Sequence, residues 1–269
     1  MSPLLEISGL SIHAGERQLV FDLDLEIHAG ERWGVIGESG SGKSLTALAS
    51  IGLLPPGLLA SGSILLDGQT VLNMSVRALT KLRGKAASAV FQEPLTALDP
   101  LMRLGAQTAE PVIRRLRREG KEVNRKAVDA EVLALFERVA LPDPARIARS
   151  YPFEISGGQR QRVAIAMALA CRPKLLIADE PTTALDVTTQ AEVLALLHEL
   201  VSDMGMALLF ISHDLAVVNS IAEKVAVMRD GAIIEKGDAQ TVLASPRHDY
   251  TAALVAAATT FEDALAGRS

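Results

Sequence analysis

A glycine-rich loop, Gly37-x4-Gly42-Lys43-Ser44, constrains the fold more than any other feature of this chain. The short apolar run at residues 33–36 predicts a buried strand before the loop, and residues 44–54 show helical spacing after it, as far as Pro55. Strand, loop and helix in this order let backbone N–H groups surround a phosphate. A chance glycine-rich turn would not have these two flanks. The sequence therefore predicts a phosphate-binding loop in an α/β fold.

The residue types in this loop each have a chemical reason to be there. The glycines let consecutive N–H groups turn inward, Lys43 is expected to reach the β- and γ-phosphate oxygens, and Ser44 is expected to coordinate Mg²⁺. The candidate binding residues are Gly37, Glu38, Ser39, Gly40, Ser41, Gly42, Lys43 and Ser44.

Two carboxylates follow a second apolar strand, which is predicted at residues 175–178. Asp179 and Glu180 come directly after it, at the edge of the sheet where such folds bind ligands. We expect Asp179 to hold the Mg²⁺ shell through water and Glu180 to polarise the attacking water as a general base. The alternative is that the pair caps a helix near Pro181.

Two further predicted strands end in candidate side chains. The strand at residues 207–211 leads to His213, which is expected to contact the γ-phosphate and to orient the water or Glu180; the alternative is a polar turn residue. The strand at residues 87–91 leads to Gln92, whose amide could reach Mg²⁺ or the attacking water. Because a helical segment follows Gln92, this residue could couple the nucleotide state to the position of that segment.

A second phosphate site is predicted at Ser156, Gly157, Gly158 and Gln159, ahead of a helical pattern at residues 161–169. A Ser-Gly-Gly turn presents a hydroxyl and unobstructed N–H groups at the positive end of a helix, which suits a phosphate. The chain therefore has two predicted phosphate sites.

The rest of the pattern predicts an α/β protein with an antiparallel part and a helical lobe. Alternation at residues 4–10 and 19–27 predicts an edge sheet with one wet face. A strand is predicted at residues 63–66, and residues 225–228 begin a hairpin through Asp230-Gly231. The pattern between residues 93 and 156 is helical, and residues 187–204 predict a crossover helix.

Composition excludes several classes of protein. A net charge of −5 argues against a general nucleic-acid binder, and the one basic cluster, at residues 114–118, is expected to be a solvated helix face. Cys171 is the only cysteine, so we expect a core residue, no disulfide framework and a reducing compartment. No apolar stretch approaches the roughly 18 to 20 residues that span a bilayer, so we expect a soluble chain that is disordered only at its ends.

These residues together resemble the ATP-binding subunit of an ABC transporter, over nearly the whole chain. In the terms of that family, residues 37–44 match Walker A, Gln92 the Q-loop and residues 155–159 the signature. Residues 175–179 match Walker B, and Glu180 after them is the catalytic glutamate. Ala184-Leu185-Asp186 matches the D-loop, and His213 is the switch histidine. Longer segments are similar to the oligopeptide, dipeptide and nickel importers of bacteria; these are residues 91–94, 156–170, 178–187 and 246–251.

The resemblance implies a P-loop NTPase core of mainly parallel sheet with an antiparallel β subdomain and a helical insertion, the ABC ATPase fold. The implied parts are a RecA-like ATP-binding core with the antiparallel subdomain at residues 1–92 and 161–244, a helical subdomain with the signature at residues 93–160, and a C-terminal tail at residues 245–269. ATP and Mg²⁺ are the implied ligands, and Asp186 is an implied nucleotide contact.

The resemblance also implies partners. Two such ATPase subunits meet head to tail, as a homodimer or a paralogous heterodimer, so that each ATP lies between one Walker A and the other subunit's signature. Transmembrane permease subunits, and indirectly an extracytoplasmic solute-binding protein, complete the implied transporter, with no nucleic acid. The implied location is the cytoplasmic face of the bacterial inner membrane, as a peripheral subunit.

The sequence departs from the family pattern at two places. An aromatic residue usually stacks on adenine about two dozen positions before Walker A, but this chain has His13 and Ala14 there, so His13 is the candidate. No cysteine follows Cys171, so no iron–sulfur cluster is expected in the tail.

Several alternatives remain open at this point. The same ATPase design serves other solutes and exporters. A cytosolic mechanical or repair ATPase would predict long coiled-coil or nucleic-acid-binding insertions, which are missing, and a non-hydrolysing partner would not need Glu180, His213 and a full Ser-Gly-Gly-Gln.

Overall fold

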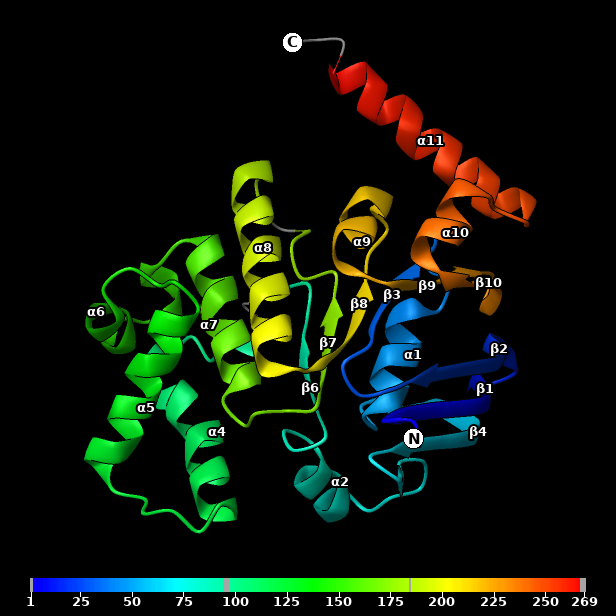
Figure 1. Cartoon of the computed structure of the whole chain (residues 1–269). Helices are drawn as coiled ribbons and strands as arrows, with labels where there is room; N and C mark the ends of the chain where they lie inside the picture. Colours follow the sequence, from blue (N-terminus) through cyan, green and yellow to red (C-terminus); the bar gives the residue numbers. More distant parts are fainter. Residues whose placement is uncertain (1, 94–96, 184, 267–269) are drawn as a thin grey trace. The chain divides into compact units, whose positions relative to one another are not determined.

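The computed structural model describes residues 2–93, 97–183 and 185–266, and its internal contacts divide the chain into two units. Met1–Leu79 and Gly205–Ser269 form the first unit, and Thr80–Met204 form the second (Figure 1). Pro94 in the predicted Q-loop segment and Ala184 in the predicted D-loop lie outside the described residues. The predicted domain boundaries at residues 92/93 and 160/161 stay predictions.

An antiparallel sheet in the first unit has the order β2-β1-β4-β5. The strands are β1 (Leu5–Ala14), β2 (Arg17–Ile27), β4 (Leu58–Leu66) and β5 (Gln69–Thr70). Along the second half of β2 the alternation is complete, because Leu23, Leu25 and Ile27 are buried while Asp24 and Glu26 are exposed. The predicted antiparallel pairing with one wet face is therefore confirmed for β1 and β2.

Strand β4 begins five residues earlier than the alternation predicted, because Gly62 interrupts the pattern without ending the strand. Gly62 has a φ of 99°, and a Cβ there would lie 2.4 Å from the carbonyl oxygen of Gly9. Only glycine permits this close approach of two backbones, which accompanies a shift in the register between β1 and β4.

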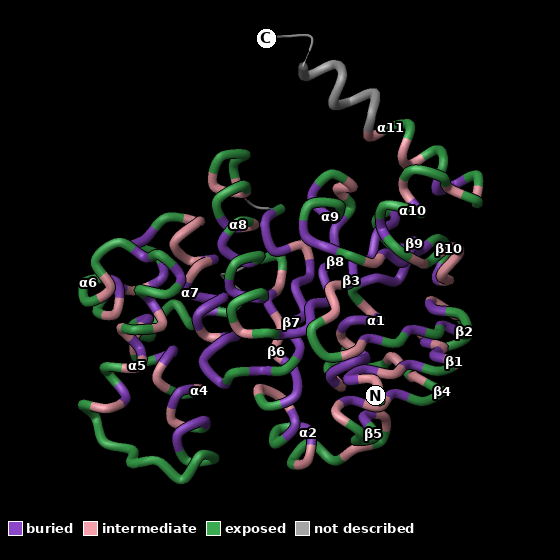
Figure 2. The backbone as a smooth tube through the Cα atoms, in the orientation of Figure 1, coloured by how far each residue is buried: buried purple, intermediate pink, exposed green. Residues whose placement is uncertain are grey.

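The other strands of the first unit have the order β10-β9-β3-β8. They are β3 (Arg32–Ile36), β8 (Ala207–Ile211), β9 (Lys224–Arg229) and β10 (Ala232–Asp238). β3 runs parallel to both β8 and β9, while β9 and β10 form the predicted hairpin. All five residues of β8 are buried, as expected for a central parallel strand (Figure 2).

Helix α1 (Lys43–Ser50) follows the glycine-rich loop and ends four residues before the predicted end. Gly52 takes a left-handed φ of 65°, and the N–H of Leu53 donates to the Leu48 carbonyl at 2.8 Å. This arrangement is a glycine-based helix stop, so the helix ends well before Pro55.

Two short helices and a longer one complete the described part of the first unit. They are α9 (Leu215–Ile221), α10 (Ala239–Ala244) and α11 (Asp249–Ala266), and α2 (Val76–Leu82) lies at the boundary between the units. The structure describes the C-terminal segment up to Ala266 as α11, which follows α10 in Figure 1. Among residues 2–93, 97–183 and 185–266, no helix is both long and apolar enough to cross a membrane.

The second unit holds a parallel strand pair and a set of helices. The strands are β6 (Ala87–Val90) and β7 (Leu175–Asp179). The helical segments are α4 (Leu104–Arg118), α5 (Arg125–Arg138), α6 (Pro144–Arg149), η1 (Pro152–Glu154), α7 (Gly157–Leu169) and α8 (Val187–Met204). β7 is buried at every residue, which explains the uninterrupted apolar pattern that precedes Asp179.

The basic cluster on α4 corrects one expectation. Arg114, Arg117 and Arg118 are exposed, but Arg115 is only 2% exposed and its guanidinium donates to Glu131 on α5 at 2.6 Å. Arg118 also donates to the Cys171 carbonyl at 2.7 Å. The cluster is therefore partly a packing feature between helices, because the buried Arg115 is paired with the half-buried Glu131.

Candidate functional site

The glycine-rich loop leaves the end of β3 in a conformation that requires glycine. Gly37 has a φ of 152°, and a Cβ there would lie 2.1 Å from the Met228 carbonyl oxygen. Gly42, directly before α1, has a φ of 98°, and its Cβ would lie 3.1 Å from Cγ2 of Val20. The sequence folds this way locally because L side chains at these two positions would be both strained and crowded.

Two buried polar groups in the loop fit an anionic ligand. Lys43 is 5% exposed, and its ammonium donates to the carbonyl oxygens of Gly37 and Glu38, both at 2.8 Å. The Ser41 hydroxyl is buried and has no hydrogen-bond partner within the described part of the chain. A buried cation and an orphaned hydroxyl beside a helix N-terminus are what a triphosphate would complete, so the residues present fit the predicted ligand.

His213 follows β8, which pairs with β3. The register aligns Val35 with Ile211, and the Ser212 N–H donates to the Val35 carbonyl at 3.2 Å. His213 is exposed and lies one residue beyond Ser212. The phosphate loop and His213 therefore leave the same edge of one sheet, as the sequence predicted.

His13, the candidate adenine contact, lies near the end of β1, where it pairs with Gln18 on β2 and Leu59 on β4. Its side chain is half-buried, whereas Leu59 is 72% exposed. Partners in register point to the same face of a sheet, so an exposed apolar side chain lies beside the imidazole. Sequence reasoning missed Leu59, because the predicted strand began only at residue 63.

The two carboxylates and the glutamine meet in the second unit. β6 and β7 run parallel with Val90 opposite Ala178, so Gln92, just beyond β6, and Asp179, the last residue of β7, lie at the same edge of the sheet. Asp179 is 7% exposed and Gln92 is exposed. This is the arrangement that the sequence predicted for these residues, although their chemical roles stay predictions.

Glu180 has an uncommon backbone conformation. Its φ is 46°, in the left-handed region that favours glycine, and the Thr183 hydroxyl donates to its Oε2 at 3.1 Å. A strained backbone and a side-chain donor together fix the direction of the carboxylate. Sequence reasoning missed Thr183, because nothing in a Pro-Thr-Thr run indicates which hydroxyl faces back to Glu180.

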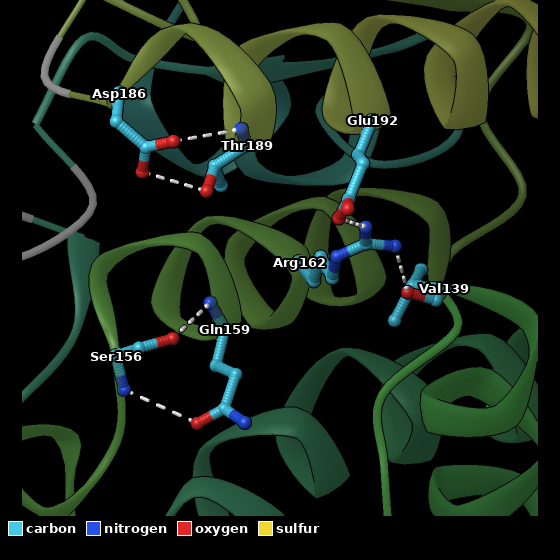
Figure 3. Close-up of polar contacts among 7 residues, drawn as sticks. All are labelled: Val139, Ser156, Gln159, Arg162, Asp186, Thr189 and Glu192. Atoms are coloured by element: carbon cyan, nitrogen blue, oxygen red, sulfur yellow. Dashed lines mark hydrogen bonds and ion pairs between the residues drawn. The ribbon is translucent and has the colours of Figure 1, made fainter.

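The predicted turn at Ser156 is the first turn of α7 itself. Ser156 is the N-cap: its hydroxyl accepts a bond from the Gln159 N–H at 3.3 Å, and the Gln159 side chain accepts one from the Ser156 N–H at 3.1 Å (Figure 3). Gly157 and Gly158 are therefore helical, which corrects the expectation that the helix starts at residue 161. The helix starts earlier because this reciprocal capping satisfies two of its end groups.

Gly158 allows α8 to approach α7. A Cβ on Gly158 would lie 2.5 Å from Cγ2 of Thr189. Arg162, further along α7, donates to Glu192 on α8 at 2.9 Å and to the Val139 carbonyl at 3.1 Å (Figure 3). The helix that starts at Ser156 is thus held in place from two sides.

Asp186 caps α8 in this structure. Its carboxylate accepts bonds from the N–H and the hydroxyl of Thr189, at 3.0 and 2.7 Å (Figure 3). The hydrogen bond from the Thr189 N–H, followed by that from its hydroxyl, lowers the pKa of Asp186 below its ordinary value. The implied nucleotide contact of Asp186 stays a prediction, and any such contact would have to coexist with this cap.

Tyr250 is a further residue at the phosphate loop that sequence reasoning missed. The Glu38 N–H donates to the Tyr250 hydroxyl at 3.1 Å, although the two residues are 212 positions apart. No local pattern could have indicated this contact, because only the fold brings the start of α11 to the loop.

A comparison with known protein families matches residues 20–183 to the ABC transporter family. The oligopeptide transport ATP-binding protein OppD of Bacillus subtilis is 41% identical over 265 residues, which cover 96% of this chain and 73% of that protein.

Two solved structures are similar in fold. The ATP-binding cassette MJ0796, a dimer in a post-hydrolysis state bound to ADP and Pi, matches with a TM-score of 0.77 and 28% identity, over 87% of this chain and 98% of that one. CbiO1 from Clostridium perfringens, part of the ABC transporter complex cbiONQ, matches with a TM-score of 0.75 and 26% identity, over 91% of this chain and 92% of that one.

Proposed function

Because this chain belongs to the ABC transporter family of ATP-binding proteins, we propose that it hydrolyses ATP to drive the import of peptides into a bacterial cell. It is an ATPase with the ABC ATPase fold. The observation that carries the proposal is the phosphate loop, in which the buried Lys43 ammonium and the orphaned Ser41 hydroxyl lie beside the start of α1.

In this proposal, the phosphates of ATP bind to the loop at residues 37–44. Lys43, whose ammonium donates to the Gly37 and Glu38 carbonyls, turns to the β- and γ-phosphate oxygens when ATP binds. The exchange is favourable because a charge-assisted bond to phosphate is stronger than a bond to a neutral carbonyl. His13 and the neighbouring exposed Leu59 provide the surface for adenine.

Ser44, Gln92 and Asp179 would hold Mg²⁺, since a hydroxyl, an amide oxygen and a carboxylate are hard oxygen donors. When bound, Mg²⁺ neutralises phosphate charge that builds up during transfer. Asp179 is only 7% exposed, so little water would compete with a cation for its carboxylate.

Glu180 is the proposed general base, and His213 the group that contacts the γ-phosphate and orients the water. Glu180 accepts a proton from the attacking water while the Thr183 hydroxyl, which donates to Oε2, holds the carboxylate in a fixed direction. Phosphoryl transfer depends mainly on positioning, so a strained but well-held carboxylate suits this role. Gln92 lies where β6 leads into the helical segments and couples the site to them.

A pair of ATPase subunits is the proposed unit of function. The start of α7 at Ser156 binds the γ-phosphate of an ATP that the partner subunit holds, and Asp186 lies near the same interface. Similarity to a dimeric cassette supports this arrangement. ATP closes the pair and its hydrolysis reopens it, which is a population shift driven by differential binding.

Exposed apolar side chains in the second unit are the proposed contact with the membrane-spanning permease. Leu101 is 85% and Phe153 68% exposed, the Phe153 ring stacks on Tyr151 at 5.6 Å, and Arg103 lies 5.7 Å from the Tyr151 ring centre. Such a patch is typical of a protein interface. Bound there, the subunit would lie at the cytoplasmic face of the inner membrane, with an external solute-binding protein delivering the peptide.

Uptake of labelled peptide in cells that lack this gene tests the proposal. Complementation with the natural chain should restore peptide uptake, and Glu180→Gln should not, although the variant still binds ATP. Restored uptake of nickel or another solute without peptide uptake would overturn the assignment of the solute. An unimpaired Glu180→Gln variant would overturn the catalytic assignment.

A further inference from the structure

The start of α11 contacts the phosphate loop at the backbone. The Glu38 N–H donates to the Tyr250 hydroxyl at 3.1 Å, and the Glu38 carbonyl accepts from Lys43 at 2.8 Å and from the Ser41 N–H at 3.2 Å. Both polar groups of this one peptide residue are therefore engaged, one inside the loop and one by the C-terminal helix. The conformation of the loop at Glu38 depends on Tyr250 as well as on the loop itself.

Tyr250 is itself firmly placed. It is 7% exposed, and the Arg229 guanidinium lies 4.9 Å from the centre of its ring. Arg229 ends β9, and in the turn that follows, the Gly231 N–H donates to the Ser41 carbonyl at 3.2 Å. The β9–β10 turn thus holds the phosphate loop directly and the ring of Tyr250 indirectly.

A second anchor fixes the segment ahead of α11. Both carboxylate oxygens of Glu235 on β10 accept backbone bonds, from the Arg247 N–H at 2.9 Å and from the His248 N–H at 3.2 Å. The Tyr250 N–H then donates to Nδ1 of His248 at 3.0 Å. Because these bonds set the position of the first turn of α11, they also set where the Tyr250 hydroxyl lies.

The hydroxyl stays protonated under ordinary conditions, because burial is the largest cause and raises the pKa of Tyr250. The bond from the Glu38 N–H lowers this pKa and the nearby Glu38 carboxylate raises it, and the net shift is upward. The hydroxyl can accept the Glu38 N–H without carrying a charge that would repel a phosphate. A neutral acceptor behind the loop therefore leaves the positive character of the site intact.

We propose that Tyr250 is a positioning residue for nucleotide binding: through its bond to the Glu38 N–H it holds the phosphate loop ready for ATP, so that the placement of α11 sets the nucleotide affinity. The inference rests on the proposed function, because it requires ATP in this loop. A loop that is already ordered loses less conformational entropy when the ligand binds. ATP and ADP should benefit equally, since both present a β-phosphate to the same loop.

Nucleotide binding to the purified full chain, by calorimetry, tests this with Tyr250→Phe, which keeps the ring under Arg229 and removes only the hydroxyl. We expect the dissociation constants of ATP and ADP to rise by the same factor, about three- to tenfold, with turnover at saturating ATP unchanged within about twofold. Unchanged affinities, or a fall in turnover without a change in affinity, would overturn the proposal. A natural chain that does not bind ATP would overturn the proposed function as well.

Asp238→Ala is the matched control. Asp238 is the N-cap of α10, and its carboxylate accepts a bond from the Thr241 N–H at 2.9 Å. Removing it destabilises a neighbouring helix without changing a contact of the phosphate loop. Nucleotide affinity should not change in this variant. An equal loss in the control would show that general destabilisation, and not the Tyr250 hydroxyl, causes the effect.

A double-mutant cycle tests whether Glu235 affects nucleotide binding through Tyr250. Glu235→Ala should weaken ATP and ADP binding by a factor no larger than Tyr250→Phe does, and the double variant should lose no more than Tyr250→Phe alone. If the two losses multiply, Glu235 does not act through Tyr250, and the proposed control of the loop by α11 is wrong.

Discussion

The phosphate loop and the start of α7 both present backbone N–H groups at a helix N-terminus, yet they differ in what surrounds them. Gly231 and Tyr250 connect the loop to other parts of its unit, and Lys43 forms bonds within the loop. The loop also contains the buried Ser41 hydroxyl, which has no hydrogen-bond partner among the residues that the structure describes. At the start of α7, Ser156 and Gln159 satisfy each other, and Ser156 is exposed.

The difference indicates which element can hold a nucleotide alone. A site with its own cation and an unsatisfied buried donor gains free energy when an anion enters. At the self-capped start of α7 the nearest cation, Arg160, donates to the Pro152 carbonyl at 2.6 Å. This helix start therefore offers mainly a helix dipole and a hydroxyl, whose effect fades within one turn. We infer that the loop binds ATP and that the start of α7 adds to a phosphate already held elsewhere.

The largest expected effect separates binding from chemistry. Glu180→Gln should lower turnover on the order of 10³-fold, because the general base is lost, while ATP affinity stays within about twofold. Turnover and calorimetric binding measure the two quantities. Glu122→Gln is the control: the Glu122 carboxylate accepts from the exposed Asn124 amide, and this variant should hydrolyse ATP normally. Normal turnover of Glu180→Gln would contradict the assignment of Glu180 as the general base.

Removing the Lys43 cation should weaken ATP binding by the phosphate loop and leave the start of α7 unaffected. For Lys43→Ala we expect ATP affinity to fall on the order of 10²-fold, since one preorganised donor to the phosphates is lost. Calorimetry measures the loss, and Lys126→Ala, at an exposed position on α5, is the control. ATP binding by Lys43→Ala at the natural affinity would contradict the comparison of the two elements.

A smaller effect on turnover is expected from a change at the start of α7. Ser156→Ala should reduce turnover about tenfold and leave ATP binding to the single chain unchanged, because this hydroxyl acts only in the pair. Ser75→Ala removes a comparable cap hydroxyl, which accepts the Ala78 N–H at 3.4 Å, and should not affect turnover. If Ser156→Ala weakened binding to the single chain as much as Lys43→Ala does, the two elements would not differ as described.

The smallest expected effect is on stability and concerns Glu31, which directly precedes β3. Burial alone would raise the pKa of Glu31, but hydrogen bonds from the His28 N–H, Lys224 and Trp33 lower it to about 2. A depressed carboxyl pKa stabilises the fold above its unfolded value of 4.5, and this contribution is lost as the pH falls from 4.5 toward 2.

Glu31→Gln should therefore lower the free energy of unfolding at pH 7 by roughly 1 to 2 kcal/mol, a figure reduced for the exposure of Lys224. Urea unfolding between pH 7 and pH 3 measures the difference, which should shrink at the acid end. Glu223→Gln, whose more exposed carboxylate pairs with Arg32, should cost less. A cost for Glu31→Gln that did not depend on pH would reject this origin of the stability.

Local pattern was enough to predict the elements around the site. The alternation in β2, the buried runs of β7 and β8 and the glycine-rich loop follow from short segments whose periodicity is decided by burial on one or both faces. Their order also placed Gln92 and Asp179 at the ends of two strands, which the pairing of β6 with β7 brings together.

Contacts between distant segments could not be predicted in this way. The bond from Glu38 to Tyr250 and the burial of Arg115 against Glu131 depend on which helix packs where, and no residue near them signals the partner. Capping also misled the prediction at α7, because two glycines resemble a turn unless the reciprocal bonds of Ser156 and Gln159 are recognised.

The most direct test of the account uses mixed pairs of differently tagged chains. A pair of Lys43→Ala with Ser156→Ala would retain one intact site if each site combines the loop of one chain with the α7 start of the other. A pair of natural chain with the Lys43→Ala, Ser156→Ala double variant would then retain none. We predict higher turnover in the first pair; higher turnover in the second would contradict the proposal that the two elements act on one ATP from different chains.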